Sequence, residues 1–279
     1  MTAEACAAAR IQARRTPWRR AVPAALLLAL SLQVAVSPAQ ERRIAPAQVK
    51  SGITFSAPGV QSLQADDFAN PGMLWVERGA ALWREPAGAA AVSCAQCHPQ
   101  PERSMKGVAT HYPRFDPASG GLIDLAGQIN ACRTARQRAE PLARESETLL
   151  ALTTFVAEQS RGLPVHVSID GPARAHFDAG RALYERRMGQ MNLACTNCHE
   201  QNWGRQLLAE TISQGYGNAY PIYRLDWQTV GSLQRRFRSC LFGVRAELWP
   251  YGAPEYLDLE LYLAWRAEGL PVETPGVRK

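Results

Sequence analysis

Two copies of a five-residue motif constrain the fold of this 279-residue chain more than any other feature of its sequence. The copies read Cys94-Ala-Gln-Cys97-His98 and Cys195-Thr-Asn-Cys198-His199. Cys-x-x-Cys-His is typical of c-type haem attachment, in which both thiols bond to the porphyrin and the adjacent imidazole binds iron. A zinc ribbon would leave both histidines unexplained, and a thioredoxin-like site would need a βαβ context that the sequence lacks. We therefore predict two covalently bound haem c groups.

The similarity between the two halves extends beyond the motifs, whose first cysteines lie 101 residues apart. In each half a helix-like segment precedes the motif and carries a glycine, with a bulky aromatic residue four positions later. In each half an apolar helical stretch follows the motif and ends in Gly-Leu-Pro-Val, where the glycine caps the helix and the proline prevents its continuation. The matching segments are Gly79 to Trp83 and Gly180 to Tyr184, then 148–160 and 255–267, then 162–165 and 269–272.

This order of helix, haem motif, long loop and closing helix resembles the cytochrome c domain. We therefore predict a mainly α fold of two tandem cytochrome c-type domains, each with a covalently bound haem and with little β structure. The predicted boundaries are 70–166 for the first domain and 167–279 for the second, with a linker over 164–172. Residues 40–69 form an N-terminal extension that belongs to neither copy, and we expect it to pack on the first domain.

The N-terminus holds most of the formal net charge of +6. Five arginines precede an apolar run from Ala21 to Val36 that ends in small residues, which is the pattern of a secretory signal peptide over residues 1–39. Removing that segment removes five Arg and one Glu, and leaves 26 positive against 24 negative charges, a net of +2. Because the remainder is nearly neutral, a nucleic-acid partner loses its main support. The apolar run is also shorter than the roughly 20 residues of a membrane anchor, so we expect a periplasmic protein without an anchor after cleavage, with an uncleaved anchor as the alternative.

Cys132 and Cys240 also recur, 38 and 45 residues after the first cysteine of their motifs. No methionine, the usual sixth ligand of a c-type haem, stands at corresponding positions of the two halves. A disulfide between Cys132 and Cys240 is one interpretation, since both are unpaired cysteines in an oxidising compartment. The favoured interpretation is that each thiolate binds the iron of its own domain, which would lower the reduction potential. His111, 13 residues after His98, is a competing ligand for the first iron.

The surroundings of Cys240 are strongly basic. The run from Arg235 to Arg245 contains four arginines and no acid. Cationic neighbours favour a thiolate, and guanidinium groups suit an oxyanion. On a helix, Arg236 and Cys240 would share one face, whereas Gln128 holds the position of Arg236 in the first half. A solvated basic face is the ordinary interpretation of such a run, but a candidate iron ligand within it favours an anion site. We therefore expect a chemical role for the second domain and a structural or electron-relaying role for the first.

These residues resemble the SoxA family, the dihaem subunits of the SoxAX cytochromes of sulfur-oxidising bacteria. Besides the two haem motifs, the resemblance rests on Ile129-Asn-Ala-Cys132-Arg133 and on Arg236-x3-Cys240. It implies that Cys240 is the catalytic cysteine, often found as a persulfide, and that Arg236 contacts the substrate. It also implies His/Cys axial ligands for both irons, with the haems attached through the paired motif cysteines. The implied axial pairs are His98 with Cys132 and His199 with Cys240, and the implied attachment pairs are Cys94 with Cys97 and Cys195 with Cys198.

The resemblance also implies an activity, that of an L-cysteine S-thiosulfotransferase. Such an enzyme joins thiosulfate oxidatively to a cysteine of the SoxYZ carrier protein. Two electrons then pass through haem to the monohaem partner SoxX, which forms a heterodimer with SoxA, and onward to a downstream cytochrome c. Two other functions stay open, namely a dihaem thiosulfate dehydrogenase that forms tetrathionate and a non-catalytic dihaem electron carrier. A dihaem peroxidase is a weaker alternative, because it would need an open iron site for peroxide.

Overall fold

The computed structural model describes residues 44–279, and within them helices dominate while every strand has only two or three residues. The prediction of a mainly α fold is therefore confirmed. The predicted signal peptide lies outside the described residues. No helix of the described part is long and apolar enough to cross a membrane.

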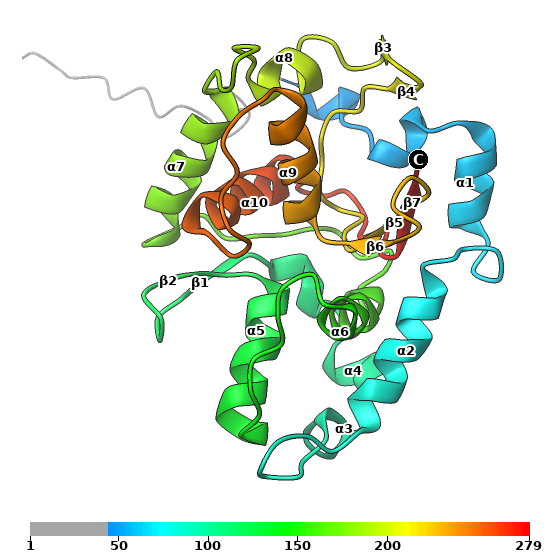
Figure 1. Cartoon of the computed structure of the whole chain (residues 1–279), viewed down its shortest axis with the longest axis vertical. Helices are drawn as coiled ribbons and strands as arrows, with labels where there is room; N and C mark the ends of the chain where they lie inside the picture. Colours follow the sequence, from blue (N-terminus) through cyan, green and yellow to red (C-terminus); the bar gives the residue numbers. More distant parts are fainter. Residues whose placement is uncertain (1–43) are drawn as a thin grey trace, which may run out of the picture. The chain divides into compact units, whose positions relative to one another are not determined.

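The first half is built on two crossing helices, α2 (Met73–Arg84) and α6 (Glu147–Glu158), seen in the lower part of Figure 1. Ser146 starts α6, because its hydroxyl accepts a hydrogen bond of 3.3 Å from the backbone N–H of Leu149. The elements between the two helices are α3 (Cys94–Cys97), α4 (Pro101–Ser104), η4 (Val108–His111), β1 (Arg114–Asp116), β2 (Gly121–Ile123), α5 (Leu125–Cys132) and the π-helical turn η5 (Arg133–Gln137).

The second half repeats this order, which confirms the internal repeat. Its crossing helices are α7 (Ala173–Glu185) and α10 (Pro254–Arg266), in the upper part of Figure 1. Between them lie α8 (Cys195–His199), the hairpin of β3 (Gln206–Leu207) and β4 (Glu210–Thr211), the hairpin of β5 (Ile222–Arg224) and β6 (Thr229–Gly231), and α9 (Leu233–Gly243). The chain ends in β7 (Gly276–Arg278), which pairs in parallel with β5.

The repeated glycine lies where the two helices of each half cross. A Cβ atom on Gly79 would come within 2.2 Å of the carbonyl oxygen of Ala151 in α6. A Cβ atom on Gly180 would come within 2.0 Å of the carbonyl oxygen of Asp258 in α10. Both distances are far below van der Waals contact, so the close approach of each helix pair requires glycine.

The two Gly-Leu-Pro-Val exits pair with each other in an antiparallel direction. The N–H of Gly162 donates to the carbonyl of Val272, and the N–H of Val272 donates to the carbonyl of Leu163, both at 2.9 Å. Pro164 stands opposite Pro271, its equivalent in the other half. Antiparallel pairing of equivalent segments relates the halves by an approximate two-fold axis close to this point.

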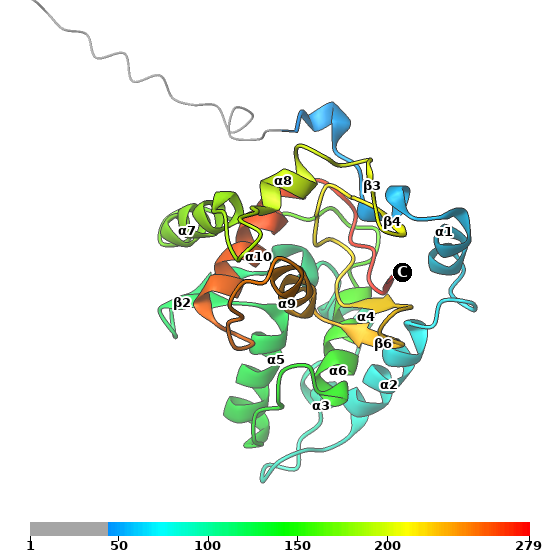
Figure 2. The same cartoon turned by 45° about the horizontal axis from the view of Figure 1, so that its top comes forward.

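The central hairpin of each half packs on the helices of the other half. Leu122 of β2 belongs to the buried cluster around α7 and α10, and both views place this hairpin beside α10 (Figure 2). Conversely, Tyr223 and Val230 pack against Leu150 of α6. The described residues accordingly form part of one compact unit, while the boundary at 166/167 stays a prediction.

The N-terminal segment packs mainly on the second half, so the expectation that it packs on the first domain is wrong. The backbone N–H of Lys50 donates to the Gln214 side chain at 2.8 Å, and the ring of Phe55 meets that of Trp203 edge-on at 6.1 Å. An exposed ion pair between Asp67 and Arg161 at 2.6 Å connects the segment to the first half. The polar partners come from loops far away in the sequence, which local patterns do not reveal. The helical elements of this segment are η2 (Pro46–Gln48), η3 (Gly52–Phe55) and α1 (Pro58–Ala65).

Candidate functional site

Each haem motif forms a short helix whose start is fixed by the third residue of that helix. In the first half, Ser93 and Gln96 exchange hydrogen bonds: the N–H of Gln96 donates to the Ser93 hydroxyl at 3.2 Å, and the N–H of Ser93 donates to the Gln96 side chain at 2.8 Å. In the second half, the N–H of Ala194 donates to the Asn197 side chain at 2.9 Å. Both motifs are thereby held as one helical turn, with cysteine at its first position.

The distal cysteines lie beside the motifs of their own halves. Burial raises the pKa of the Cys94 thiol, and the nearby Cys132 acts in the same direction. Burial likewise raises the pKa of the Cys195 thiol to about 12, again with a contribution from the nearby Cys240. Burial also raises the pKa of the Cys198 thiol, and the nearby Cys240 contributes to this rise. The structure brings together each predicted set of cysteines, and among residues 44–279 none of them is joined in a disulfide.

His199 is held in a defined orientation by a loop of its own half. Its Nδ1 lies 2.8 Å from the carbonyl oxygen of Ser213, which can only accept, so Nδ1 carries the proton and Nε2 is left with its lone pair. Gly215, with φ of +75°, lets this loop close on the ring, since a Cβ atom there would lie 2.7 Å from Cγ of His199. Burial, together with the nearby Arg236 and Arg266, lowers the pKa of His199 to about 4, although the hydrogen bond to Ser213 acts in the opposite direction. A neutral imidazole with a fixed tautomer is what an iron ligand needs.

His98 is placed by different contacts. The indole N–H of Trp83 donates to the backbone carbonyl of His98 at 3.4 Å, and the two rings lie 5.9 Å apart.

His111 and His166 are paired with each other at the surface: Nδ1 of His111 lies 2.9 Å from the carbonyl of His166, and His166 contacts Glu268. Met105 packs into the core around α2 and α6.

Arg236 faces Cys240. The pKa of its guanidinium is raised chiefly by the Cys240 thiol, while burial acts in the opposite direction. Among residues 44–279, the Arg236 side chain makes no hydrogen bond or ion pair, and the acids Glu210 and Asp226 only add to the rise of its pKa. The guanidinium could therefore accept an anion beside Cys240. Tyr220 lies in the same environment, because both Arg236 and Cys240 affect its pKa, which burial raises; the sequence signal for it is the Tyr-Pro dipeptide that recurs at Tyr112 and Tyr220.

The other three arginines of the basic run contact neighbouring residues. Of the four arginines predicted to form an anion site, only Arg236 therefore remains without a side-chain partner among the described residues. Arg235 stacks on the Trp227 ring at 4.4 Å. Arg238 lies 4.8 Å above the ring of Tyr251 and donates to the carbonyl of Trp249. Arg245 donates to the side chain of Gln190 at 3.4 Å.

The first half replaces this cation by a neutral amide. Gln128, at the position of Arg236, points its side-chain nitrogen at the sulfur of Cys132 at a distance of 3.6 Å. Its carbonyl oxygen accepts a hydrogen bond of 2.8 Å from Arg114. The two halves thus present similar cysteine and histidine sets in different electrostatic surroundings.

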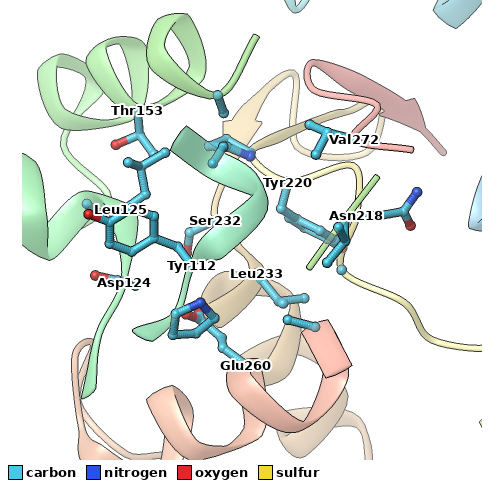
Figure 3. Close-up of a pocket in the computed structure, with 18 of the residues that line it drawn as sticks. Tyr112, Asp124, Leu125, Thr153, Asn218, Tyr220, Ser232, Leu233, Glu260 and Val272 are labelled. Atoms are coloured by element: carbon cyan, nitrogen blue, oxygen red, sulfur yellow. The ribbon is translucent and has the colours of Figure 1, made fainter. Parts of the chain in front are cut away.

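A separate cavity of about 140 Å³ lies between the halves near the approximate two-fold axis. Figure 3 shows Tyr112 and Leu125 of the first half on its wall together with their equivalents Tyr220 and Leu233. Neither motif histidine and none of the six described cysteines lines it. The cavity is therefore distinct from the two histidine–cysteine sites.

The donor sets fit c-type haem. Each motif offers two thiols and one imidazole on a single turn, with another thiol beside it, and His199 has Nε2 available. Sequence reasoning found these residues, but it missed the buried Arg266 and Glu200 next to His199, which pair at 3.5 Å. Their only sequence signal is that the matching positions of the first half hold the uncharged Gln159 and Pro99.

Comparison with known proteins agrees with this architecture. The sequence matches the family described as SoxA/TsdA, cytochrome c domain, over residues 78–165 and 179–272, one match in each half. It is 41% identical over 230 residues to the L-cysteine S-thiosulfotransferase subunit SoxA of Pseudaminobacter salicylatoxidans (82% of this chain, 80% of that protein). It is 39% identical over 231 residues to the subunit of the same name from Rhodovulum sulfidophilum (83% and 80%).

A solved structure extends the likeness to three dimensions. The crystal structure of SoxXA from P. pantotrophus matches with a TM-score of 0.80 at 38% identity, and the match covers 83% of this chain and 87% of that chain. The two tandem cytochrome c-type domains expected from the sequence are therefore confirmed. The chain belongs to the SoxA/TsdA cytochrome c family.

Proposed function

We propose that this chain is the SoxA subunit of an L-cysteine S-thiosulfotransferase, which joins thiosulfate oxidatively to a cysteine of a SoxYZ carrier protein. The observation that carries the proposal is the unpartnered Arg236 guanidinium beside Cys240. Thiosulfate is a small dianion, and a half-buried guanidinium that forms no ion pair with a carboxylate among the described residues suits it. The names of the relatives support the same activity.

Two haem c groups complete the sites in this proposal. One would be held by the thiols of Cys94 and Cys97 and the other by those of Cys195 and Cys198. His98 and Cys132 would bind the iron of the first, and His199 and Cys240 that of the second. When bound, the second haem supplies the electron acceptor that an oxidative sulfur–sulfur bond requires.

The reaction balances as a two-electron oxidation. A sulfur–sulfur bond forms between the carrier cysteine and the terminal sulfur of thiosulfate, the carrier thiol loses its proton, and two electrons leave. Arg236 binds and orients the thiosulfate anion. Cys240 is the catalytic cysteine, and the terminal sulfur of thiosulfate is bound beside it. The electrons pass to a SoxX partner in a heterodimer and on to a downstream cytochrome c. The signal peptide over residues 1–39 would place this chemistry in the periplasm.

The test is a reconstituted reaction with SoxX, SoxYZ, thiosulfate and an oxidised cytochrome c. We expect the carrier to gain a thiosulfate adduct by mass spectrometry while the cytochrome is reduced. Cys240→Ala is expected to abolish the adduct, and Cys132→Ala serves as the matched variant in the half without an Arg236 equivalent. Tetrathionate formed from thiosulfate in the absence of SoxYZ would instead identify a thiosulfate dehydrogenase. Adduct formation that is unchanged by Cys240→Ala would indicate an electron carrier.

A further inference from the structure

A buried charged network lies next to His199 and contacts the loop that accepts the hydrogen bond from Nδ1 of this histidine. It consists of Tyr184, Glu200 and Arg266, and the residues at the matching positions of the first half are Trp83, Pro99 and Gln159. Three positions that meet in space have thus changed together between the two copies. The matching positions of the first half carry no charge.

Arg266 is the centre of this network. It is the last residue of α10, and its side chain is only 6% exposed. Its Nη1 donates to the Tyr184 hydroxyl at 2.6 Å, and its Nη2 lies 3.5 Å from Oε1 of Glu200, whose side chain is 5% exposed. The guanidinium carbon also lies 5.3 Å from the ring centre of Tyr216. Such a buried ion pair is costly to desolvate and strongly destabilised when one partner is removed.

Two connections link the network to His199. Glu200 is the residue that follows His199 in the sequence. Arg266 also lies 3.4 Å from the carbonyl oxygen of Gln214, the neighbour of Ser213, and Ser213 accepts the hydrogen bond from Nδ1 of His199. Arg266 therefore anchors both the residue after the histidine and the loop that fixes the orientation of its ring.

We propose that Tyr184, Glu200 and Arg266 are positioning residues for His199, and that they give the second haem a reduction potential distinct from that of the first. The groups around a ligating histidine fix its tautomer and orientation and tune its basicity. The proposal rests on the proposed function in one respect, namely that a haem is bound at Cys195 and Cys198.

The two charges allow a test with opposite signs. Arg266→Gln leaves the Glu200 carboxylate beside His199, which stabilises the oxidised iron, so the potential of the second haem should fall. Glu200→Gln leaves the guanidinium alone, so the same potential should rise. The potential of the first haem should not change in either variant. Arg161→Gln, which removes an exposed arginine after the closing helix of the first half, is the matched control and should leave both potentials unchanged.

The measurement is a redox titration of the dihaem protein followed by EPR, which resolves the two haems. Potentials of the second haem that equal the wild-type value in both variants, or that shift in the same direction, would overturn the proposal. Tyr184→Phe removes only a hydroxyl and provides a variant that keeps the ring and the charges; an altered EPR signal confined to the second haem is expected. An unaltered signal in that variant would count against the network.

The two levels of proposal fail in different ways. Wild-type protein that carries a single haem, or forms no carrier adduct, contradicts the proposed function before any variant is compared. A wild-type dihaem protein that forms the adduct, but whose potentials ignore Glu200 and Arg266, contradicts only the positioning network.

Discussion

Arg236 and Gln128 hold the same position in the two halves and give the two distal cysteines different surroundings. Arg236 faces Cys240 with an unpartnered charge, whereas Gln128 places an amide 3.6 Å from the sulfur of Cys132. Neutral amides bind a dianion less well than a guanidinium does. In the proposed function, this difference lets the site at Cys240 bind the anionic substrate more tightly than the site at Cys132 would.

Replacement of Arg236 by Gln should therefore impair thiosulfate conjugation while the fold is kept. We expect kcat/KM for thiosulfate to fall by about 10²-fold, which is the typical cost of removing one group that stabilises a reacting anion. Arg245→Gln, at an exposed arginine paired with Gln190, should stay close to wild type. Equal losses in the two variants would show that general basicity, and not Arg236, matters.

Glu260 of α10 gives a prediction about pH. Burial raises its pKa well above the ordinary value, and the nearby Asp124 raises it further, while Arg144 and Gln234 act in the opposite direction. The folded protein therefore binds this proton more tightly than the unfolded chain does. The resulting stabilisation is fully present below the ordinary carboxyl pKa of about 4.3 and is lost as the pH rises through the raised pKa.

Glu260→Gln mimics the protonated acid and should remove this loss. Above the ordinary carboxyl pKa of about 4.3, the Tm of the variant should fall less with rising pH than the Tm of wild type. Glu140→Gln, at an exposed position, is the control and should keep the wild-type slope. A variant that follows the wild-type curve throughout would mean that Glu260 is ionised in the folded protein.

At the scale of elements, the two helix crossings depend on glycine. Gly79→Ala and Gly180→Ala would force a methyl group onto the backbone of α6 or α10. We expect each to lower the free energy of unfolding by about 1–3 kcal/mol, the usual cost of overpacking. Gly59→Ala in α1 is the control, because a Cβ atom there meets nothing within 4 Å; it should stabilise by about 0.5–1 kcal/mol. Denaturant unfolding measures all three, and a neutral effect at both crossings would contradict the packing described.

The secondary-structure elements could be predicted where a short-range sequence pattern specifies them. The haem motifs, the glycine-to-aromatic helices and the Gly-Leu-Pro-Val exits all follow from short-range patterns. The packing of each central hairpin on the opposite half, an exchange of hairpins, was not predictable from local patterns. The buried neighbours of Leu122 and Tyr223 lie in the other half of the chain. The site divides in the same way: spacing identified Cys240 and Arg236, but only packing assigns Arg235 to Trp227 and leaves Arg236 without a partner.

At the scale of the whole molecule, the two halves depend on each other. Each central hairpin completes the hydrophobic core of the opposite half, and the two exits are paired at Pro164 and Pro271. A half produced alone would expose the surfaces that its partner covers. The sequence repeat therefore does not make the halves separable.

Separate production of residues 44–166 and 167–279 tests this dependence. Each half alone should lack a cooperative thermal transition, whereas the intact protein should unfold in one. Co-expressed halves should associate and elute together in size-exclusion chromatography. Two independently folded, monomeric halves would contradict the exchanged-hairpin arrangement.

The proposed haem chemistry depends most on which residues would bind the two irons together with His98 and His199. Near-infrared magnetic circular dichroism of the oxidised protein, combined with its intact mass, tests this directly. We predict a mass that includes two haems, with low-spin signals of histidine/thiolate coordination from both. A histidine/methionine band from both haems, or the mass of a single haem, would contradict the assignment of Cys132 and Cys240 as ligands.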